Sequence, residues 1–163
     1  MAKCKSFKPQ ISENSKILVL GSMPGVKSLE MQQYYAHPQN RFWKLMGLFC
    51  NCKNMHEFNY EQKINTLLKN NFALWDVIKT CEREGSLDSD IEKEIPNKIP
   101  KLLKKYKNIE TICLNGNKAY TAFKKHFPEL MKQYKICKMP STSPANAKYT
   151  LQKLYDEWKT LFC

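Results

Sequence analysis

A short apolar segment that runs directly into a glycine-containing loop constrains the fold of this chain most. Residues 17–20 read Ile-Leu-Val-Leu, and residues 21–25 read Gly-Ser-Met-Pro-Gly. A strand without alternating polar residues is typical of the centre of a parallel sheet, where both of its faces are buried. Ligands of open parallel sheets bind outside the carboxyl ends of the strands. The sequence therefore predicts an α/β fold with a ligand site in the loop after residue 20.

Three further apolar segments and several helical patterns follow this first strand. The other strands are expected at residues 72–78, 109–114 and 134–139. Helices are expected where apolar residues recur every three or four positions, namely from residue 40, across 61–70, after Pro96, across 118–127 and across 147–162. Four strands separated by helices predict a three-layer α/β/α architecture with a central four-stranded parallel sheet.

The chain of 163 residues has the length of one domain, and no linker, repeat or low-complexity segment divides it. Residues 1–15 show no clear periodicity and are expected to form an irregular lead-in. Residues 80–95 are rich in charge and are expected to form a loop with one short helix. We therefore predict a single domain over residues 1–163.

The chain carries a large excess of positive charge. Lysine and arginine total 27 against 15 acidic residues, which gives a formal net charge of +12. Such an excess favours an acidic polymer, nucleic acid above all, as the partner. A lysine-rich surface without that role is the alternative. Residues 95–138 hold eleven lysines but only two glutamates, and there the favoured interpretation is the solvated outer faces of two helices.

The cysteine count, the lack of metal-ligand spacing and the lengths of the apolar runs narrow the kinds of protein that this chain can be. The seven cysteines are an odd number and the N-terminus lacks the apolar core of a signal peptide, so a disulfide framework is not expected. No cluster of His, Cys and Asp has the spacing of a metal site, and we expect neither a metal nor a cofactor. No apolar run approaches the roughly 18 residues of a membrane span. We therefore expect a cytoplasmic protein that does not bind membranes.

Three segments, in the right order, resemble the motifs of the uracil-DNA glycosylase superfamily. The first is GSMPG with the YYAHPQNRFW that follows, the second is LWDVIKTCEREGSLDSDI, and the third is PSTSPANA. Together they most resemble the hypoxanthine-DNA (deoxyinosine) glycosylase family, while AHPQNRFW is similar to a segment of the mismatch-specific uracil/thymine glycosylases. The resemblance implies a four-stranded parallel sheet between helices. It also implies hydrolysis of the N-glycosidic bond of a deaminated base that is flipped out of double-stranded DNA.

The resemblance implies that Tyr35 and Asp76 bind the flipped base. Tyr35 falls where the superfamily places an aromatic ring against the base, and a planar ring can stack on any base. Tyr34 is its competitor, and a half-buried core tyrosine is the structural alternative. Asp76 falls where relatives place a base-reading side chain, and its carboxylate would accept a hydrogen bond from an N–H on the base edge. For Asp76 the alternative is a helix cap or a loop carboxylate.

The first motif is expected to supply backbone contacts, with the catalytic group further along the chain. Backbone amides at Ser22 and Met23 would bind a base carbonyl, and Gly21 would permit that close approach. Met23 stands where many relatives carry the polar residue that activates water, which a thioether cannot do. Asn40 is therefore the expected catalytic residue, since its amide could hold water and stabilise a cationic sugar. Its alternative and compatible role is to cap the helix that follows.

The segment MPSTSPANA resembles the loop with which relatives grip the DNA backbone. Its expected DNA-binding residues are Ser141, Thr142, Ser143, Pro144 and Asn146. The serines could bond phosphates, and the proline could wedge between bases. The alternative is a Ser/Pro loop that caps the final helix. His37 is expected to orient its own loop, and Asn115 is expected to be a turn residue.

Water is the expected nucleophile, because no lysine in the motif segments is placed to form a Schiff base. We predict a monofunctional, monomeric glycosylase that releases hypoxanthine from deoxyinosine. One alternative is a uracil or thymine mismatch glycosylase on the same scaffold. The other is a non-catalytic nucleic-acid-binding relative, which methionine at positions 23 and 139 would favour.

Overall fold

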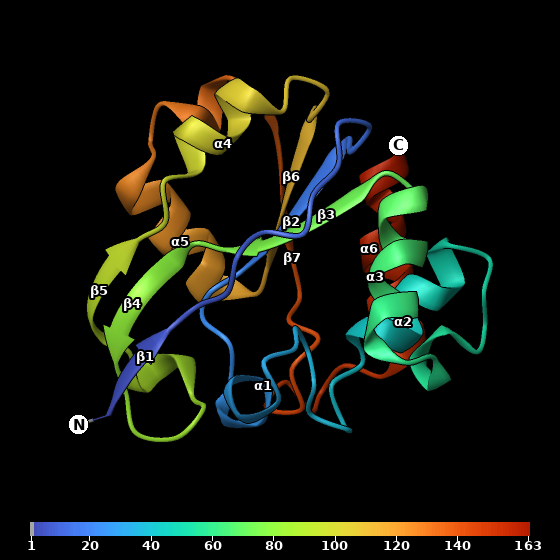
Figure 1. Ribbon diagram of the computed structural model, residues 1–163, viewed down its shortest axis with the longest axis horizontal. Coiled ribbons are helices and arrows are strands. Elements are labelled where there is room, and N and C mark those ends of the chain that lie inside the picture. The colour runs from blue at the N-terminus through green and yellow to red at the C-terminus, as the bar shows by residue number, and fades with distance from the viewer. Residues whose placement is uncertain (1) are drawn as a thin grey trace.

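A parallel sheet of four strands forms the centre of the protein (Figure 1). The computed structural model describes residues 2–163. The strands follow the order β3-β2-β6-β7, and every neighbouring pair is parallel. Their bounds are Phe72–Asp76 for β3, Ile17–Gly21 for β2, Thr111–Asn115 for β6 and Lys135–Met139 for β7. The predicted four-stranded parallel sheet is therefore confirmed.

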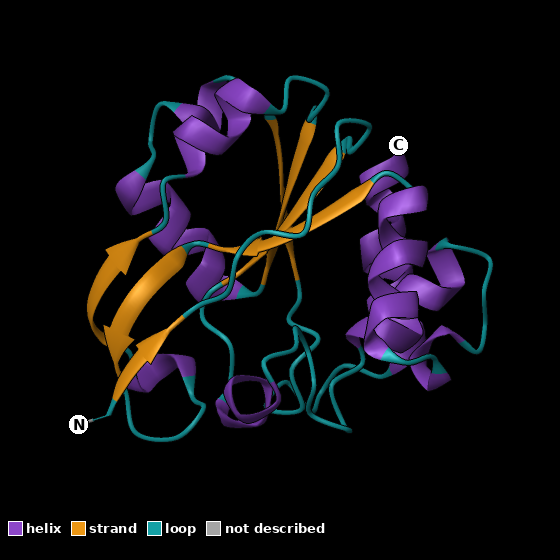
Figure 2. Cartoon of the chain, in the orientation of Figure 1, coloured by secondary structure: helices purple, strands orange, loops and turns teal. Residues whose placement is uncertain are grey.

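Helices cover both faces of this sheet and complete the three layers (Figure 2). The helices of one face are α2 (Phe42–Phe49), α3 (Tyr60–Lys69) and α6 (Leu151–Trp158). Those of the other face are α4 (Ile99–Lys105) and α5 (Asn117–His126). Val19 packs in the first of these two layers, and Leu18 and Leu20 pack in the second. Polar alternation is missing from β2 because both of its faces are covered.

The remaining elements are short. Helix α1 (Val26–Met31) lies beside the carboxyl ends of the central strands, and the sequence pattern does not predict it because six residues make too few turns for a periodic signal. Four 3₁₀ turns cover Met55–Glu57, Asp88–Asp90, Leu130–Lys132 and Lys159–Phe162. The final helix begins at Leu151 rather than at residue 147, because the Thr150 hydroxyl accepts a hydrogen bond from the Lys153 N–H and caps it.

A second sheet lies beside the first and corrects three of the sequence-based expectations. Its strands β1 (Lys3–Lys5), β4 (Ile78–Glu82) and β5 (Glu92–Pro96) are antiparallel, in the order β1-β4-β5. The lead-in over residues 1–15 therefore contains a strand, and residues 80–95 contain parts of two. Residues 72–78 are not one strand, because β3 ends at Asp76 and β4 begins at Ile78 in the other sheet.

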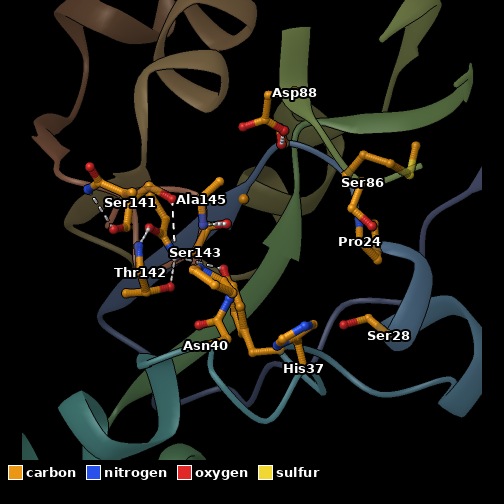
Figure 3. A pocket seen from close by; sticks show the side chains of 18 of the residues that line it. Pro24, Ser28, His37, Asn40, Ser86, Asp88, Ser141, Thr142, Ser143 and Ala145 are labelled. Carbon is orange, nitrogen blue, oxygen red and sulfur yellow. Dashed lines mark hydrogen bonds between the residues drawn. The ribbon is translucent and has the colours of Figure 1, made fainter. Parts of the chain in front are cut away.

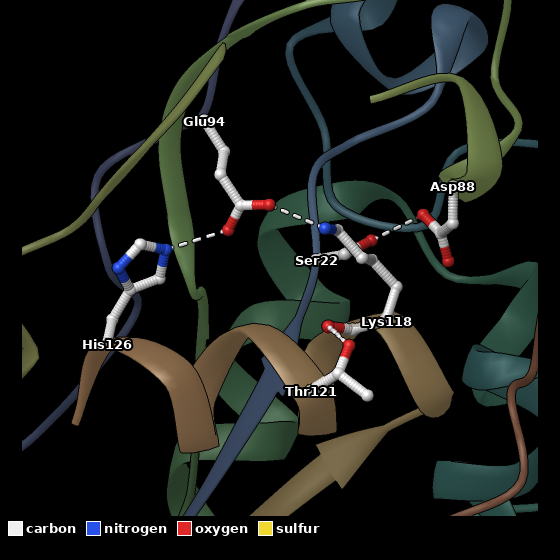
Figure 4. A network of polar contacts seen from close by, with 6 residues as sticks. All are labelled: Ser22, Asp88, Glu94, Lys118, Thr121 and His126. Atoms are coloured by element: carbon white, nitrogen blue, oxygen red, sulfur yellow. Dashed lines mark hydrogen bonds and ion pairs between the residues drawn. The ribbon is translucent and has the colours of Figure 1, made fainter. Parts of the chain in front are cut away.

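The second sheet gives a weak sequence signal because charged residues dominate it. β1 reads Lys-Cys-Lys and β5 reads Glu-Lys-Glu-Ile-Pro, so neither shows an apolar run. Polar contacts attach this sheet to the helical layer (Figure 4). Glu94 of β5 accepts a hydrogen bond from Lys118 Nζ at 2.5 Å, and its other oxygen lies 2.8 Å from His126 Nε2, both from α5. Such strands form through their neighbours rather than through their own propensity.

The lysine-rich helix α4 lies at the end of the central sheet opposite the loops that follow its carboxyl ends (Figure 1). This position supports the interpretation of the α4 lysines as a solvated outer face, because ligands bind at the carboxyl ends. Within residues 2–163, no helix has the length and apolar character needed to cross a membrane.

Candidate functional site

A cavity of about 830 Å³ opens at the carboxyl ends of the central strands. Three segments line it: the β2–α2 segment (residues 22–41), the β4–β5 loop (residues 83–91) and the β7–α6 loop (residues 140–150). Figure 3 shows them around the cavity, with Ser86 and Asp88 on one side, Ser141 to Ala145 on another, and His37 and Asn40 between. The ligand site predicted after the first strand therefore coincides with the cavity.

The floor of the cavity consists of Gly21, Tyr35, Asp76 and Asn115. Gly21 has no room for a side chain, since a Cβ there would lie 2.6 Å from Asp76 Oδ1 and 3.2 Å from Tyr35 Oη. Asn115 Nδ2 donates a hydrogen bond to Tyr35 Oη at 3.2 Å. Because Gly21 has no side chain, the Asp76 carboxyl and the Tyr35 hydroxyl can approach each other from distant segments.

Asp76 is a buried carboxyl that opens onto the cavity. Its side chain is only 4% exposed, and among the described residues its Oδ2 atom has no hydrogen-bond partner. Burial, reinforced by the negative charge of Asp88 and opposed by Arg83, raises the pKa of Asp76 to about 7. Because Asp76 is the last residue of β3 and β4 begins two residues later, it does not cap a helix. An unpartnered carboxyl here is available for a hydrogen bond with a ligand in the cavity.

Tyr34 and Tyr35 both line the cavity, but it is the Tyr35 hydroxyl that approaches Gly21 and Asn115 in its floor. Tyr34 is buried, and its hydroxyl donates to the Lys8 carbonyl at 2.8 Å, which makes it a core residue. Tyr35 has a left-handed backbone (φ 54°), and its ring stacks on Phe42 with centroids 4.0 Å apart. Burial and the nearby Asp76 raise the pKa of Tyr35, so its hydroxyl stays neutral. Stacking of a base on Tyr35 stays a prediction.

Asn40 lies on the cavity wall and contributes to the start of α2. Its Oδ1 accepts a hydrogen bond from the Phe42 N–H at 3.0 Å, but the N-cap position of α2 is Arg41, so Asn40 is not the helix cap that was the alternative. Its Nδ2 makes no hydrogen bond to any residue within 2–163, and a carbonyl oxygen has a second lone pair. His37 shapes the turn before it, since the Asn40 N–H donates to the His37 carbonyl at 2.9 Å. A catalytic role for Asn40 is compatible with this geometry and stays a prediction.

Arg41 holds the β7–α6 loop in place, which the sequence pattern does not indicate. Its Nη2 atom donates to the Ser143 carbonyl at 2.7 Å and to the Asn146 carbonyl at 3.1 Å. Its Nε atom donates to the Thr142 carbonyl at 3.4 Å. A guanidinium has donors in a rigid fork, which suits one side chain that gathers several carbonyls. The motif that carries Asn40 therefore also positions the loop expected to meet DNA.

One expectation for the β7–α6 loop needs correction. Thr142 is fully buried, and its hydroxyl accepts a hydrogen bond from Asn115 Nδ2 at 3.1 Å, so its side chain cannot reach a DNA backbone in this conformation. Asn146 is half-buried and lines the cavity; its Nδ2 donates to the Ser141 carbonyl at 2.9 Å, and a contact of this side chain with DNA stays a prediction. Asn115 is not a turn residue either, because it ends β6 and joins Tyr35 to this loop.

The other residues of the loop remain accessible. Ser141 and Ser143 are half-buried, and their hydroxyl oxygens accept hydrogen bonds from backbone N–H groups of Ser143 and Ala145. Each hydroxyl hydrogen is left to donate to another acceptor, such as a phosphate. Pro144 is half-buried beside them and lines the cavity. Contacts of these three residues with DNA stay predictions.

The β4–β5 loop is bound to the first motif, a connection that sequence inspection misses. Ser22 Oγ donates to Asp88 Oδ1 at 2.6 Å (Figure 4), and the Val26 N–H donates to Ser86 Oγ at 2.9 Å. The buried Arg83 donates through Nη2 to the Pro24 carbonyl. The signal that could have found this loop is the GSLDS segment, whose small and acidic residues follow Asp76 in the second motif.

The apolar side chain of Met23 in the first motif is buried. Its side chain is buried against Cys4, Ile78 and Cys81, between the first motif and the second sheet. Only backbone groups of Met23 can therefore serve a ligand. No group of three or more His, Cys, Asp or Glu side chains within residues 2–163 is arranged to hold a metal ion.

The chain is similar in sequence and fold to known proteins. The family profile described as "Uracil DNA glycosylase superfamily" matches residues 8–161. A hypoxanthine DNA glycosylase from Methanosarcina acetivorans is 37% identical over 160 residues, which cover 97% of each chain. A hypoxanthine DNA glycosylase from Methanosarcina barkeri is 38% identical over 117 residues, which cover 72% of this chain and 73% of that protein. The solution NMR structure of a candidate uracil DNA glycosylase from Methanosarcina acetivorans aligns with a TM-score of 0.84 and 36% identity, covering 99% of this chain and 97% of that one.

Proposed function

This chain belongs to the uracil DNA glycosylase superfamily, and from that membership we propose that it is a DNA glycosylase that releases hypoxanthine from deoxyinosine in double-stranded DNA. The observation that carries the proposal is the buried, unpartnered Asp76 in the floor of the cavity. Two relatives that cover most of the chain are named hypoxanthine DNA glycosylases. The cavity of about 830 Å³ has the size of a ligand pocket.

The base-reading step follows from the chemistry of the floor. A flipped hypoxanthine presents an N1–H donor, and the buried Asp76 accepts that hydrogen bond when it is ionised. Tyr35 provides a ring for the base to stack on. Amides at Ser22 and Met23 provide donors for the base carbonyl, and Gly21 permits its close approach. Adenine carries no N1–H, so the carboxylate distinguishes the deaminated base from its normal parent.

The hydrolytic step requires a positioned water and stabilisation of a cationic sugar. Asn40 holds the water through Oδ1, whose second lone pair is unused, and its Nδ2 donates to the sugar or phosphate. The water oxygen bonds to C1′ as the bond from C1′ to the base nitrogen breaks, and the electron pair of that bond leaves with the base. The proton lost by the water ends on the departing base or in solvent. Ser141 and Ser143 hold the flanking phosphates.

Duplexes with a single deoxyinosine, deoxyuridine or mismatched thymidine test the proposal. Each is incubated with the protein and then cleaved with alkali at abasic sites. Release at inosine alone is the expected result. Release at uracil with none at inosine would identify the uracil glycosylase, and binding without release would identify a non-catalytic relative. Sodium borohydride should trap no covalent complex, because water is the nucleophile.

Asn40→Ala tests the catalytic assignment within the same assay. We expect the single-turnover rate on inosine to fall by about 100-fold or more, with the affinity for DNA nearly unchanged. Asn65→Ala is the matched control, because Asn65 is exposed on α3 and lies outside the cavity. A variant at position 40 that keeps the wild-type rate would exclude a catalytic role for Asn40.

A further inference from the structure

Cys4 of β1 and Cys81 of β4 lie directly opposite each other in the second sheet. They are paired residues in the antiparallel register of these two strands. Both are free thiols, and their side chains are buried in one small apolar cluster with Met23 of the first motif and Ile78. Hydrolysis of a glycosidic bond by water needs neither thiol, so the proposed function leaves this pair without a role.

The pairing of the strands places the two cysteines within the range of a disulfide. Two residues away on each side, backbone hydrogen bonds of 2.8 Å join Ser6 to Lys79 and Arg83 to Ala2. Because hydrogen-bonded pairs alternate along an antiparallel ladder, Cys4 and Cys81 are such a pair, with Cα atoms about 5.5 Å apart. Disulfides span Cα separations of about 4.4 to 6.8 Å. Oxidation of the pair therefore needs no change in the register of the strands.

Cys4 can become accessible without unfolding of the core. β1 is an edge strand of three residues, so it can open locally at a small cost in free energy. The described strand registers place one other pair opposite each other, Cys113 and Cys137, but Cys113 is fully buried in the central sheet. An oxidant reaches Cys113 only when the core opens. The pair in the second sheet is therefore the more reactive of the two.

We propose that Cys4 and Cys81 form a reversible disulfide in the presence of a thiol oxidant and thereby crosslink β1 to β4 beneath the first motif. When β1 opens, the Cys4 thiolate attacks one sulfur of an oxidant such as glutathione disulfide and displaces one glutathione thiolate. The Cys81 thiolate then attacks Cys4 Sγ and displaces the second glutathione. The two protein thiols lose two electrons and two protons, which leave in two molecules of reduced glutathione.

Burial of the pair limits the rate of this exchange. Burial, with the nearby Cys4 as the second cause, raises the pKa of the Cys81 thiol. The thiolate is the attacking species, so the closed pair is inert and the exchange waits until β1 opens. The pair therefore responds slowly, to sustained oxidation, and is not a fast peroxide sensor.

Two contacts connect the pair to the candidate site. The Met23 side chain packs in the same cluster, and Arg83, two residues after Cys81, donates to the Pro24 carbonyl. A disulfide draws the Cβ atoms from about 5.5 Å to about 3.8 Å, which changes the surface on which Met23 rests. The amides of Ser22 and Met23 shift with it, and kcat/KM on inosine falls about fivefold. This consequence rests on the proposed function, whereas the disulfide itself does not.

Incubation of the reduced protein with glutathione disulfide tests for the crosslink. Mass spectrometry of the digested protein should show peptides linked through Cys4 and Cys81, and dithiothreitol should separate them. The melting temperature should rise by about 5 °C, because the bond closes a long loop of the unfolded chain. Cys4→Ala and Cys81→Ala should show neither change, and Cys163→Ala, the matched control at an exposed cysteine, should show both. Absence of the linked peptides in the wild type would overturn the proposal, as would an equal rise in melting temperature in Cys4→Ala.

The inosine assay tests the connection to the first motif. Oxidised wild-type protein should show the fivefold loss in kcat/KM and recover with dithiothreitol, whereas the same treatment should leave Cys4→Ala unchanged. Full activity of the crosslinked protein would overturn the connection, and so would an equal loss in Cys4→Ala, which would place the effect at another cysteine. If the reduced wild type releases no inosine, the proposed function fails, while the linked peptides and the melting temperature still decide whether the disulfide forms.

Discussion

Replacement of Asp76 by asparagine should stabilise the protein, and the gain should grow with pH. The pKa of Asp76 is raised from 3.8 to about 7 in the folded state, chiefly by burial. Between these two values the folded carboxyl keeps a proton that the unfolded chain has lost, so stability falls as the pH rises and levels off above about 7. The slope is about 1.4 kcal/mol per pH unit. From about pH 5.5 to about pH 8.5 the wild type should therefore lose roughly 2 kcal/mol that Asp76→Asn does not lose.

Urea unfolding of both proteins at the two pH values measures this difference. The readout is the change in the stability gap between wild type and variant, because pH-independent effects of the amide cancel in it. Asp90→Asn is the matched control, since the same substitution on an exposed side chain should leave the gap constant. A gap that stays constant for Asp76→Asn would refute the raised pKa and the reasoning about burial that gives it.

The pH dependence of activity, compared between the wild type and Asp76→Asn, should show why the protein keeps a carboxyl that lowers its stability. If the ionised carboxyl reads the base, kcat/KM of the wild type on inosine rises through about pH 7, as Asp76 loses its proton. Asp76→Asn should give a lower and flat profile over that range, since an amide oxygen accepts a hydrogen bond without titrating. A wild-type profile that falls through pH 7 would instead require the protonated form. Functional sites commonly retain such destabilising groups.

Two further substitutions test how the site is assembled. Gly21→Ala would place a Cβ 2.6 Å from Asp76 Oδ1 and displace the carboxyl. We therefore expect kcat/KM to fall about 100-fold with an unchanged circular dichroism spectrum. Near-wild-type activity would show that Asp76 does not have to stay in place. Arg41→Lys removes the forked contacts to the Ser143 and Asn146 carbonyls. The affinity for duplex DNA, measured by fluorescence anisotropy, should therefore fall about fivefold. An unchanged affinity would show that the β7–α6 loop holds its shape without these contacts.

The central sheet and the approximate positions of its helices follow from local pattern. β2 is an uninterrupted apolar strand because helices cover both of its faces, and that burial leaves a direct trace in the sequence. The helices with long amphipathic periods leave a similar trace. The second sheet leaves almost none, because its strands are short, charged and stabilised by pairing with each other. Pairing between distant segments is not a local property.

The site residues also divide into those that the sequence identifies and those that only the tertiary structure identifies. Tyr35, Asp76 and Asn40 could be selected because each lies in a segment that resembles a motif of the superfamily. Thr142 could not be distinguished from its neighbours in a run of small polar residues, and only its burial beside Asn115 separates a brace from a DNA contact. Arg41 could not be recognised either, since its partners are carbonyls about a hundred residues away.

The opening apolar strand and its glycine loop by themselves indicated a parallel α/β protein with a site after residue 20. They could do so because strand burial and loop flexibility depend on local composition. Only the tertiary structure decided what that loop contacts. It brought the β4–β5 loop onto Ser22 and Val26 and placed Asp76 within 2.6 Å of the Cβ position of Gly21. These relations depend on packing between segments about 50 to 70 residues apart, and no local pattern records packing at that separation.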